Sequence, residues 1–168
     1  MNIKSFQKGD AHSEARYSDC ERYRFMLTRI WDPRGKRAVF IMLNPSTATE
    51  AQNDPTVERC ERRARALGFG GFRVANIFAW RATDPKDLRA TSDPVGPEND
   101  ESIIESALWA DHIVCAWGVH GSLLGRGQFV EAMLREKDLT LLHLGLTKDG
   151  HPKHPLYISY RRELEAWE

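Results

Sequence analysis

The sequence predicts an α/β protein: a three-layer αβα sandwich with a four-stranded, mostly parallel central sheet and an N-terminal antiparallel hairpin strand. Two observations carry this prediction. The run from Val39 to Leu43 is continuously apolar and stops at Asn44, which is typical of a parallel strand buried on both faces. Strand-like and helix-like segments then alternate along the chain. Such alternation favours a parallel sheet with helices on both faces and right-handed crossovers.

Four segments are predicted to form the parallel part of the sheet. The first runs from Arg37 to Leu43. An alternating segment from Arg22 to Trp31 precedes it, joined by the turn signal Asp32-Pro33-Arg34-Gly35, so these two are expected to form an antiparallel hairpin. The remaining strands are apolar runs that end at polar residues or glycine. They are expected over 72–79, 112–117 and 139–144.

Helix signals separate these strands. Asp54 suits an N-cap position and Pro55 suits the first helical turn, so a helix is predicted from there to about Leu67, before Gly68. Residues 1–20 are polar and are predicted to be a loose leader, and the whole chain, 1–168, is predicted to be one domain. Further helices are expected over 98–110 and 129–135, with one helical turn at 85–90 and a short closing helix over 161–167.

Composition restricts the classes of function. Lysine plus arginine and aspartate plus glutamate each number 24, so the net charge is zero, which disfavours nonspecific polyanion binding but not a local basic face. Neither a membrane-spanning run nor a signal peptide is recognisable, so we expect a cytoplasmic protein without a membrane partner. Cys20, Cys60 and Cys115 form no Cys-x-x-Cys pair, and no metal or other cofactor is expected. The sequence leaves the oligomeric state open.

The polar residues that follow the predicted strands are the candidate site. Parallel strands bring their carboxyl ends to one edge of the sheet, where open α/β sheets bind ligands. The segments Asn44-Pro45-Ser46-Thr47, Asn76 to Arg81, Trp117-Gly118 and the loop holding His151 and His154 are therefore expected to share one pocket.

Each candidate side chain has a structural alternative. Asn44 orients a water or binds a substrate amide, or it is a turn residue before Pro45. Asn76 interrupts an apolar strand, so its amide either ties strand to loop or reads the edge of a ligand such as a nucleobase. His154 is either a neutral donor to a carbonyl oxygen or anion, or an ordinary surface histidine. Trp117 is either core or pocket wall.

The ordered set of strand-end motifs resembles the uracil-DNA glycosylase superfamily over roughly residues 38–158. That family carries an Asp-Pro or Asn-Pro pair after its first parallel strand, then an Asn-containing strand end, an apolar-Trp-Gly strand end and a C-terminal His-Pro loop. The counterparts here are Leu43-Asn44-Pro45, Ala75-Asn76-Ile77-Phe78, Cys115-Ala116-Trp117-Gly118 and His154-Pro155-Leu156.

This resemblance implies a glycosylase-like fold and an N-glycosidase, a hydrolase that releases a nucleobase from nucleic acid or a nucleotide. It implies that Asn44 positions the attacking water and that His154 stabilises the departing base. Asn76 then recognises the base edge, and Leu156 or Tyr157 fills the space of a flipped nucleotide. Pro45, Ser46, Thr47, Phe78 and Trp117 complete the implied substrate-binding set.

The whole chain resembles a second family more closely: a bacterial family known as domain of unknown function 1643. Its hallmarks here include Tyr23-Arg24-Phe25 and the stretch from Met42 to Ala48. This resemblance implies no activity. Two alternatives to the glycosidase therefore stay open: a non-catalytic module that binds a nucleotide or modified base in the same pocket, and an interaction protein whose polar strand ends only cap helices.

Overall fold

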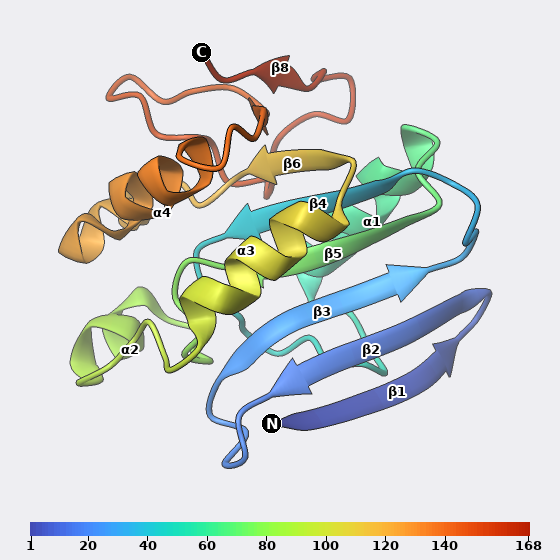
Figure 1. Cartoon of the computed structure of the whole chain (residues 1–168), viewed down its shortest axis with the longest axis horizontal. Coiled ribbons are helices and arrows are strands. Elements are labelled where there is room, and N and C mark those ends of the chain that lie inside the picture. Colours follow the sequence, from blue (N-terminus) through green and yellow to red (C-terminus); the bar gives the residue numbers. More distant parts are fainter.

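Apolar runs form the middle of a single eight-stranded mixed sheet in a computed structural model that describes all 168 residues (Figure 1). The strand order is β1-β2-β3-β5-β4-β6-β7-β8. The strands are β1 (Asn2–Lys8), β2 (Ala11–Tyr17), β3 (Arg24–Ile30), β4 (Arg37–Met42), β5 (Gly71–Asn76), β6 (His112–Cys115), β7 (Leu141–His143) and β8 (Glu165–Ala166).

Strands β5, β4, β6 and β7 run parallel to one another. Phe40 of β4 lies between Val74 of β5 and Val114 of β6, so the carboxyl ends of these strands meet at one edge of the sheet. In Figure 1 the arrowheads of β4 and β6 point towards this edge, where α2 (Pro85–Ala90) lies. The predicted α/β class is confirmed. The sheet is larger than the four strands expected, because antiparallel strands extend it on both sides.

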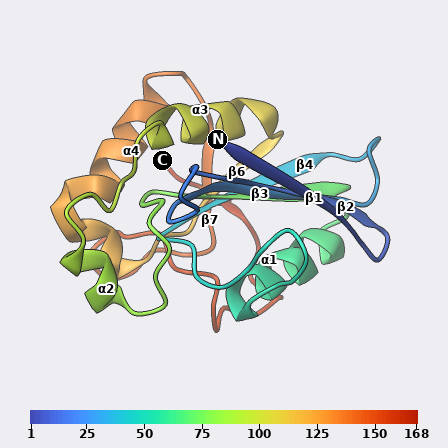
Figure 2. The same ribbon diagram turned by 90° about the horizontal axis from the view of Figure 1, so that it is seen from below.

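Helices cover both faces of the sheet, as the view in Figure 2 shows. Helix α1 (Pro55–Ala66) lies on one face, and α3 (Asn99–Trp109) and α4 (Arg126–Arg135) lie on the other. Two separate apolar clusters fill the two interlayer spaces: Phe40 and Phe72 belong to the cluster under α1, whereas Val39 and Ile41 belong to the cluster under α3 and α4. The central strands are thus buried on both faces, which explains their unbroken apolar sequence. No helix has the length and apolar character needed to cross a membrane.

Residues 1–20 are not the loose leader that the sequence predicted, because they form the hairpin β1–β2. Buried and exposed residues alternate along β2, but the sequence does not show this as an alternation of apolar and polar residues. Its inward positions are filled by Ala11, Ser13 and Ala15 together with Tyr17, and three of these four are small residues that do not read as an apolar stripe. Their small size lets the hairpin pack closely against the layer beneath.

Two further expectations are wrong in detail. The segment β3 is an antiparallel strand, but it pairs with β2 and β5 rather than with β4, so it forms no hairpin with the strand that follows it. Residues 161–167 form no helix. The carbonyl of Leu141 accepts from the amide of Trp167, and the short strand β8 closes the sheet instead.

A β-bulge interrupts the pairing of β2 with β3. Arg16 pairs with Met26 but Tyr17 pairs with Arg24, so Phe25 is passed over. In a regular strand Arg24 would share a face with Met26; the bulge turns it to the opposite face, towards α1. The side chain of Arg24 therefore lies on the α1 side of the sheet, next to the carboxyl ends of β4 and β5.

Candidate functional site

A small cavity of about 40 Å³ lies at the carboxyl ends of β4 and β5. It opens next to a larger cleft of about 490 Å³, and both are lined by Asn44, Ser46, Asp54, Thr56 and His154. We call these the inner cavity and the outer cleft. The inner cavity accommodates the edge of a planar group or a few waters, whereas the outer cleft is in the size range of small-molecule sites. The remaining residues of the inner cavity are Arg24, Met42, Pro45, Val57 and Asn76.

Asn76 is the most unusual residue of the inner cavity. It is the last residue of β5 and is 1% exposed, yet neither Oδ1 nor Nδ2 of its side chain has a hydrogen-bond partner. An unpaired buried amide costs about 1–3 kcal/mol. The side chain does not tie strand to loop, because the backbone does that work: the amides of Ile77 and Phe78 donate to the carbonyls of Met42 and Leu43.

The backbone behind Asn76 is held by two buried side chains of the opposite face. Asn99, at the start of α3, donates from Nδ2 to the carbonyls of Asn76 and Ile77 at 3.0 and 3.2 Å. Arg126, at the start of α4, donates from Nε to the Ile77 carbonyl at 2.8 Å. These contacts fix the direction in which the Asn76 amide leaves the strand.

Asn44 forms the wall between the inner cavity and the outer cleft. Its Nδ2 donates to the carbonyls of Ala82 at 2.7 Å and Pro45 at 3.1 Å. The amide nitrogen is thus used within the protein, and Oδ1 is the atom left to accept from a ligand or water. A contact of 3.2 Å between the hydroxyls of Ser46 and Thr83 joins the two loops that form this wall.

His154 closes the cavity from the C-terminal loop. Its Nδ1 accepts from the amide of Leu156 at 3.3 Å, so the proton of the neutral ring is on Nε2. Burial lowers the pKa of His154, and the nearby carboxylate of Asp54 opposes this only in part. Gly118, three residues after β6, has a φ of 73°, which favours glycine, and a Cβ there would be in ordinary contact with the Cβ of His154 at 3.4 Å. His154 is therefore a neutral hydrogen-bond donor near neutral pH.

The titration of His154 makes stability depend on pH. Because its pKa in the folded protein lies below the ordinary value of 6.5, the unfolded chain takes up this proton first as the pH falls. The contribution of the neutral His154 ring to the free energy of unfolding is present above about pH 6.5. It is lost as the pH falls towards the lower pKa that His154 has in the folded state. We expect urea unfolding to show a smaller loss of stability on acidification for His154→Gln than for the unchanged protein. Equal losses in the two proteins would contradict this assignment.

Asp54 and Arg24 are the charged residues of the inner cavity. Asp54 caps α1, accepting from the amide of Val57 at 2.9 Å, and its other oxygen accepts from the amide of Ala48 at 3.2 Å. The N-cap prediction is confirmed. Arg24 is 1% exposed, and burial lowers its pKa to about 10. Its guanidinium donates from Nη1 to the Ala48 carbonyl at 2.9 Å, and its Nε has no partner.

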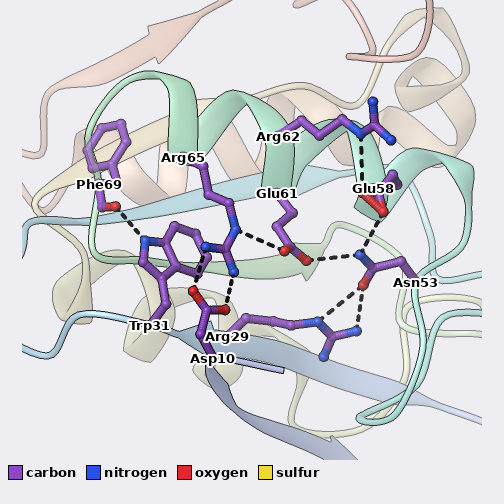
Figure 3. A network of polar contacts seen from close by, with 9 residues as sticks. All are labelled: Asp10, Arg29, Trp31, Asn53, Glu58, Glu61, Arg62, Arg65 and Phe69. Carbon is purple, nitrogen blue, oxygen red and sulfur yellow. Dashed lines mark hydrogen bonds and ion pairs between the residues drawn. The ribbon is translucent and has the colours of Figure 1, made fainter. Parts of the chain in front are cut away.

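The loop that carries Ser46 to Asn53 is fixed from below by Arg29. This fully buried side chain donates to the hydroxyl of Ser13 and, through Nε and Nη2, to Oδ1 of Asn53 at 3.1 and 2.7 Å. It also donates to the carbonyls of Thr49 and Gln52. Figure 3 shows the network continuing from Asn53 to the acidic residues of α1 and, through Arg65, to the β1–β2 turn at Asp10. The pocket wall is thus anchored to the sheet.

The structure brings most of the expected site residues together. Asn44, Pro45, Ser46, Asn76 and His154 line the inner cavity. Thr47 and Leu156 line the outer cleft, together with His120. Tyr157 lies beside this cleft in the chain and is 90% exposed with a φ of 72°, so an aromatic ring is displayed to solvent in a backbone conformation that such residues rarely adopt.

Two expected residues lie elsewhere. Phe78 is fully buried in the cluster under α3 and α4, and Trp117 belongs to the same cluster. Trp117 lines a separate cavity of about 180 Å³, where Gly121 and Gly127 leave room for its indole ring. Arg24 was not among the expected site residues, because regular alternation assigns it to the other face. No group of histidine, cysteine, aspartate or glutamate side chains is arranged to hold a metal ion.

The fold and the site define an α/β protein with a polar pocket at the carboxyl ends of its parallel strands. The chain belongs to the family described as protein of unknown function (DUF1643), which matches residues 24–156 and so includes every residue of the inner cavity. No curated protein and no solved structure matches the chain.

Proposed function

We propose that this protein is an N-glycosidase that binds a nucleobase of a nucleic acid or nucleotide with one edge in the inner cavity and the rest in the outer cleft, and that hydrolyses the bond of the base to the sugar. The observation that carries the proposal is the Asn76 amide, buried with both polar atoms free. A donor and an acceptor side by side match the donor/acceptor edge of a base. A bound base would remove the cost of leaving them unpaired.

The other groups of the pocket have matching roles. The Nε2–H of His154 would donate to a carbonyl oxygen of the base, where negative charge develops as the base departs. Oδ1 of Asn44 would accept from the attacking water, since Nδ2 is held by the Ala82 carbonyl. The hydroxyls of Ser46 and Thr47 in the outer cleft would bind the sugar or phosphate. The strand-end motifs that resemble uracil-DNA glycosylases support the same assignment.

The reaction balances without a cofactor. The oxygen of water forms a bond to the anomeric carbon of the sugar, and the glycosidic C–N bond breaks with its electron pair going to the base. One proton of the water is released to solvent or to the departing base. Because the sugar carries oxocarbenium character in such reactions, a water that is oriented by an amide oxygen suffices as nucleophile.

Leu156 and Tyr157 fit a role at the rim of the pocket. Leu156 lines the outer cleft, and the exposed ring of Tyr157 follows it directly. Either side chain could occupy the space left in a stack by an extruded nucleotide.

A second candidate function is a non-catalytic module that binds a nucleotide or modified base. One observation favours it: the only carboxylate of the inner cavity, Asp54, uses its oxygens on the amides of Val57 and Ala48, so no carboxylate is free to act as a general base. Tight binding without turnover is the expected behaviour of such a module.

Base release tests the proposal. Single- and double-stranded DNA and RNA oligonucleotides carrying uracil, hypoxanthine, xanthine or bulky modified pyrimidines are incubated with the protein, with Asn44→Ala and with His154→Asn. We expect one base to be released, with rates at least about 100-fold lower in both variants although both remain folded. Asn44→Ala should melt slightly lower, because the carbonyls of Ala82 and Pro45 lose a donor. Ser122→Ala, which lies outside the pocket, serves as the control with full activity. Release that survives both substitutions, or no release from any substrate, would contradict the proposal.

A further inference from the structure

A second cavity lies apart from the candidate site, among α4, the 3-10 segment η1 (Val119–Gly125) and the loop that leads to His154. Its volume is about 180 Å³, and it shares no lining residue with the inner cavity or the outer cleft. A cavity of about 150 Å³ takes a six-membered ring such as benzene. We call this space the tryptophan cavity after Trp117 and Trp167, which line it. No step of the proposed reaction uses it.

The tryptophan cavity contains a buried indole N–H group without a hydrogen-bond partner. Trp117 is 2% exposed, and a Cβ on Gly127 would lie 2.6 Å from its Nε1, so bare backbone lies against the N–H edge of the ring. Among the tryptophans, Trp31 alone donates from Nε1 to a group of the protein. A buried indole N–H ordinarily has an acceptor. Trp117 therefore brings an unused donor to the lining of this cavity.

The strongest acceptors of the cavity are two carboxylates, and one of them is already paired. Glu131 of α4 accepts from Nε of Arg135 at 2.8 Å, and the same guanidinium lies 5.3 Å from the ring centre of Trp167. Arg135 thus neutralises Glu131, whose second oxygen stays able to accept. Asp149 is the other carboxylate and is exposed. A serine, a glutamine and a histidine, which can each donate and accept, complete the polar lining.

This combination of groups selects a class of ligand. An anion is disfavoured, because two carboxylates and neither lysine nor arginine line the cavity. A cation finds Glu131 and Trp167 engaged by Arg135, and it offers no acceptor to the indole N–H. A neutral polyol meets each requirement. Its hydroxyl oxygens accept, its hydroxyl protons donate to carboxylates, and its C–H groups pack on an aromatic ring.

We propose that the tryptophan cavity binds a single sugar unit. The apolar face of the sugar ring packs against Trp167, and one of its hydroxyl oxygens accepts from Nε1–H of Trp117. Other hydroxyls of the sugar donate to Glu131 and Asp149. This binding site goes beyond the proposed function and does not depend on it, since the two sites have no residue in common.

The indole N–H signals in two-dimensional NMR spectra test this proposal, with the signal of Trp117 assigned by its absence in Trp117→Phe. The sugar probes are glucose, galactose, ribose and N-acetylglucosamine. Cyclohexanol, a ring with a single hydroxyl, and tetramethylammonium, a cation, are the comparisons. We expect at least one sugar to move the Trp117 signal with a dissociation constant of about 1 mM or lower, and to bind at least about tenfold more tightly than either comparison.

Two variants and two controls locate the binding. Trp117→Phe keeps an aromatic ring but removes the donor, and Asp149→Ala changes an exposed side chain. Each should weaken sugar binding about fivefold, the effect of one hydrogen bond, with the Trp167 signal as the readout in Trp117→Phe. Trp109→Phe, at the end of α3 and outside the cavity, should bind like the unchanged protein. Asn76→Leu should do the same, so a failure of base release leaves this test unaffected.

The possible outcomes are distinct. Because Asp149 is exposed, its replacement should leave the melting temperature unchanged, so weaker binding by Asp149→Ala is not a loss of folding. A Trp117 signal that no sugar moves, or sugar binding that is unchanged in both variants, would overturn the proposal. Cyclohexanol that binds as tightly as the sugars would contradict recognition of hydroxyls. Tighter binding of tetramethylammonium would identify a cation site instead.

Discussion

Replacing Asn76 by leucine is expected to stabilise the protein and to abolish base binding. Leucine has the same number and branching of side-chain heavy atoms as asparagine and removes two buried polar atoms that have no partner. The free energy of unfolding should rise by about 1–3 kcal/mol, the usual cost of an unsatisfied buried polar group. Urea unfolding gives the stability, and titration with the base that is released gives the binding. A gain in stability paired with a loss of function is the signature of a residue that is retained for its ligand.

Ser106 provides the matched control for this prediction. Its hydroxyl is also buried without a partner, but it lies in α3, away from the pocket. Ser106→Ala should be neutral or stabilising and should leave binding unchanged. If Asn76→Leu destabilises the protein while Ser106→Ala does not, the Asn76 amide has a structural role and the account of the site is wrong.

Replacing Arg29 by methionine is expected to have the opposite effect on stability, with a loss of at least about 3 kcal/mol. The guanidinium is fully buried and donates to the side chains of Ser13 and Asn53 and to the carbonyls of Thr49 and Gln52. Methionine fills much of the volume but leaves these acceptors without a donor. Because the same loop carries the wall of the outer cleft, base release should fall together with the melting temperature.

Arg62 is the control for Arg29. It belongs to the same network in Figure 3, but it is exposed and pairs only with Glu58 one turn away on α1. Exposed pairs of this kind contribute little, so Arg62→Ala should change the unfolding free energy by no more than about 0.5 kcal/mol. A small effect of Arg29→Met, similar to that of Arg62→Ala, would show that the loop folds without its anchor.

The parallel core of the fold could be predicted from sequence because its signals are local. The apolar run ending at Asn44 marks a buried strand, and Asp54 with Pro55 marks the start of a helix. The hairpin β1–β2 could not be predicted in this way, because its buried positions are mostly alanine and serine. The pairing of β3 with β5 depends on contacts between segments more than 40 residues apart, which no local pattern encodes.

The candidate site shows the same division. Asn44, Asn76 and His154 follow predictable strand ends, and parallel topology brings them to one cavity. Arg24 depends on a bulge, and a shift of one residue moves a side chain to the other face of a sheet. Phe78 and Trp117 also follow predicted strands, but their side chains pack in the cluster under α3 and α4. The position of a residue along its strand therefore did not predict on which face of the sheet its side chain lies.

The most direct measurement is an NMR titration that follows the side-chain amide of Asn76 as free bases are added to the protein. Its resonances are assigned by their absence in Asn76→Leu. We expect a base with a complementary edge to shift these resonances strongly, as the free amide gains its hydrogen bonds, and the ring signals of His154 to shift with them. A base that binds and is released without perturbing the Asn76 amide, or an amide that responds to no base, would contradict the claim that this cavity reads a nucleobase.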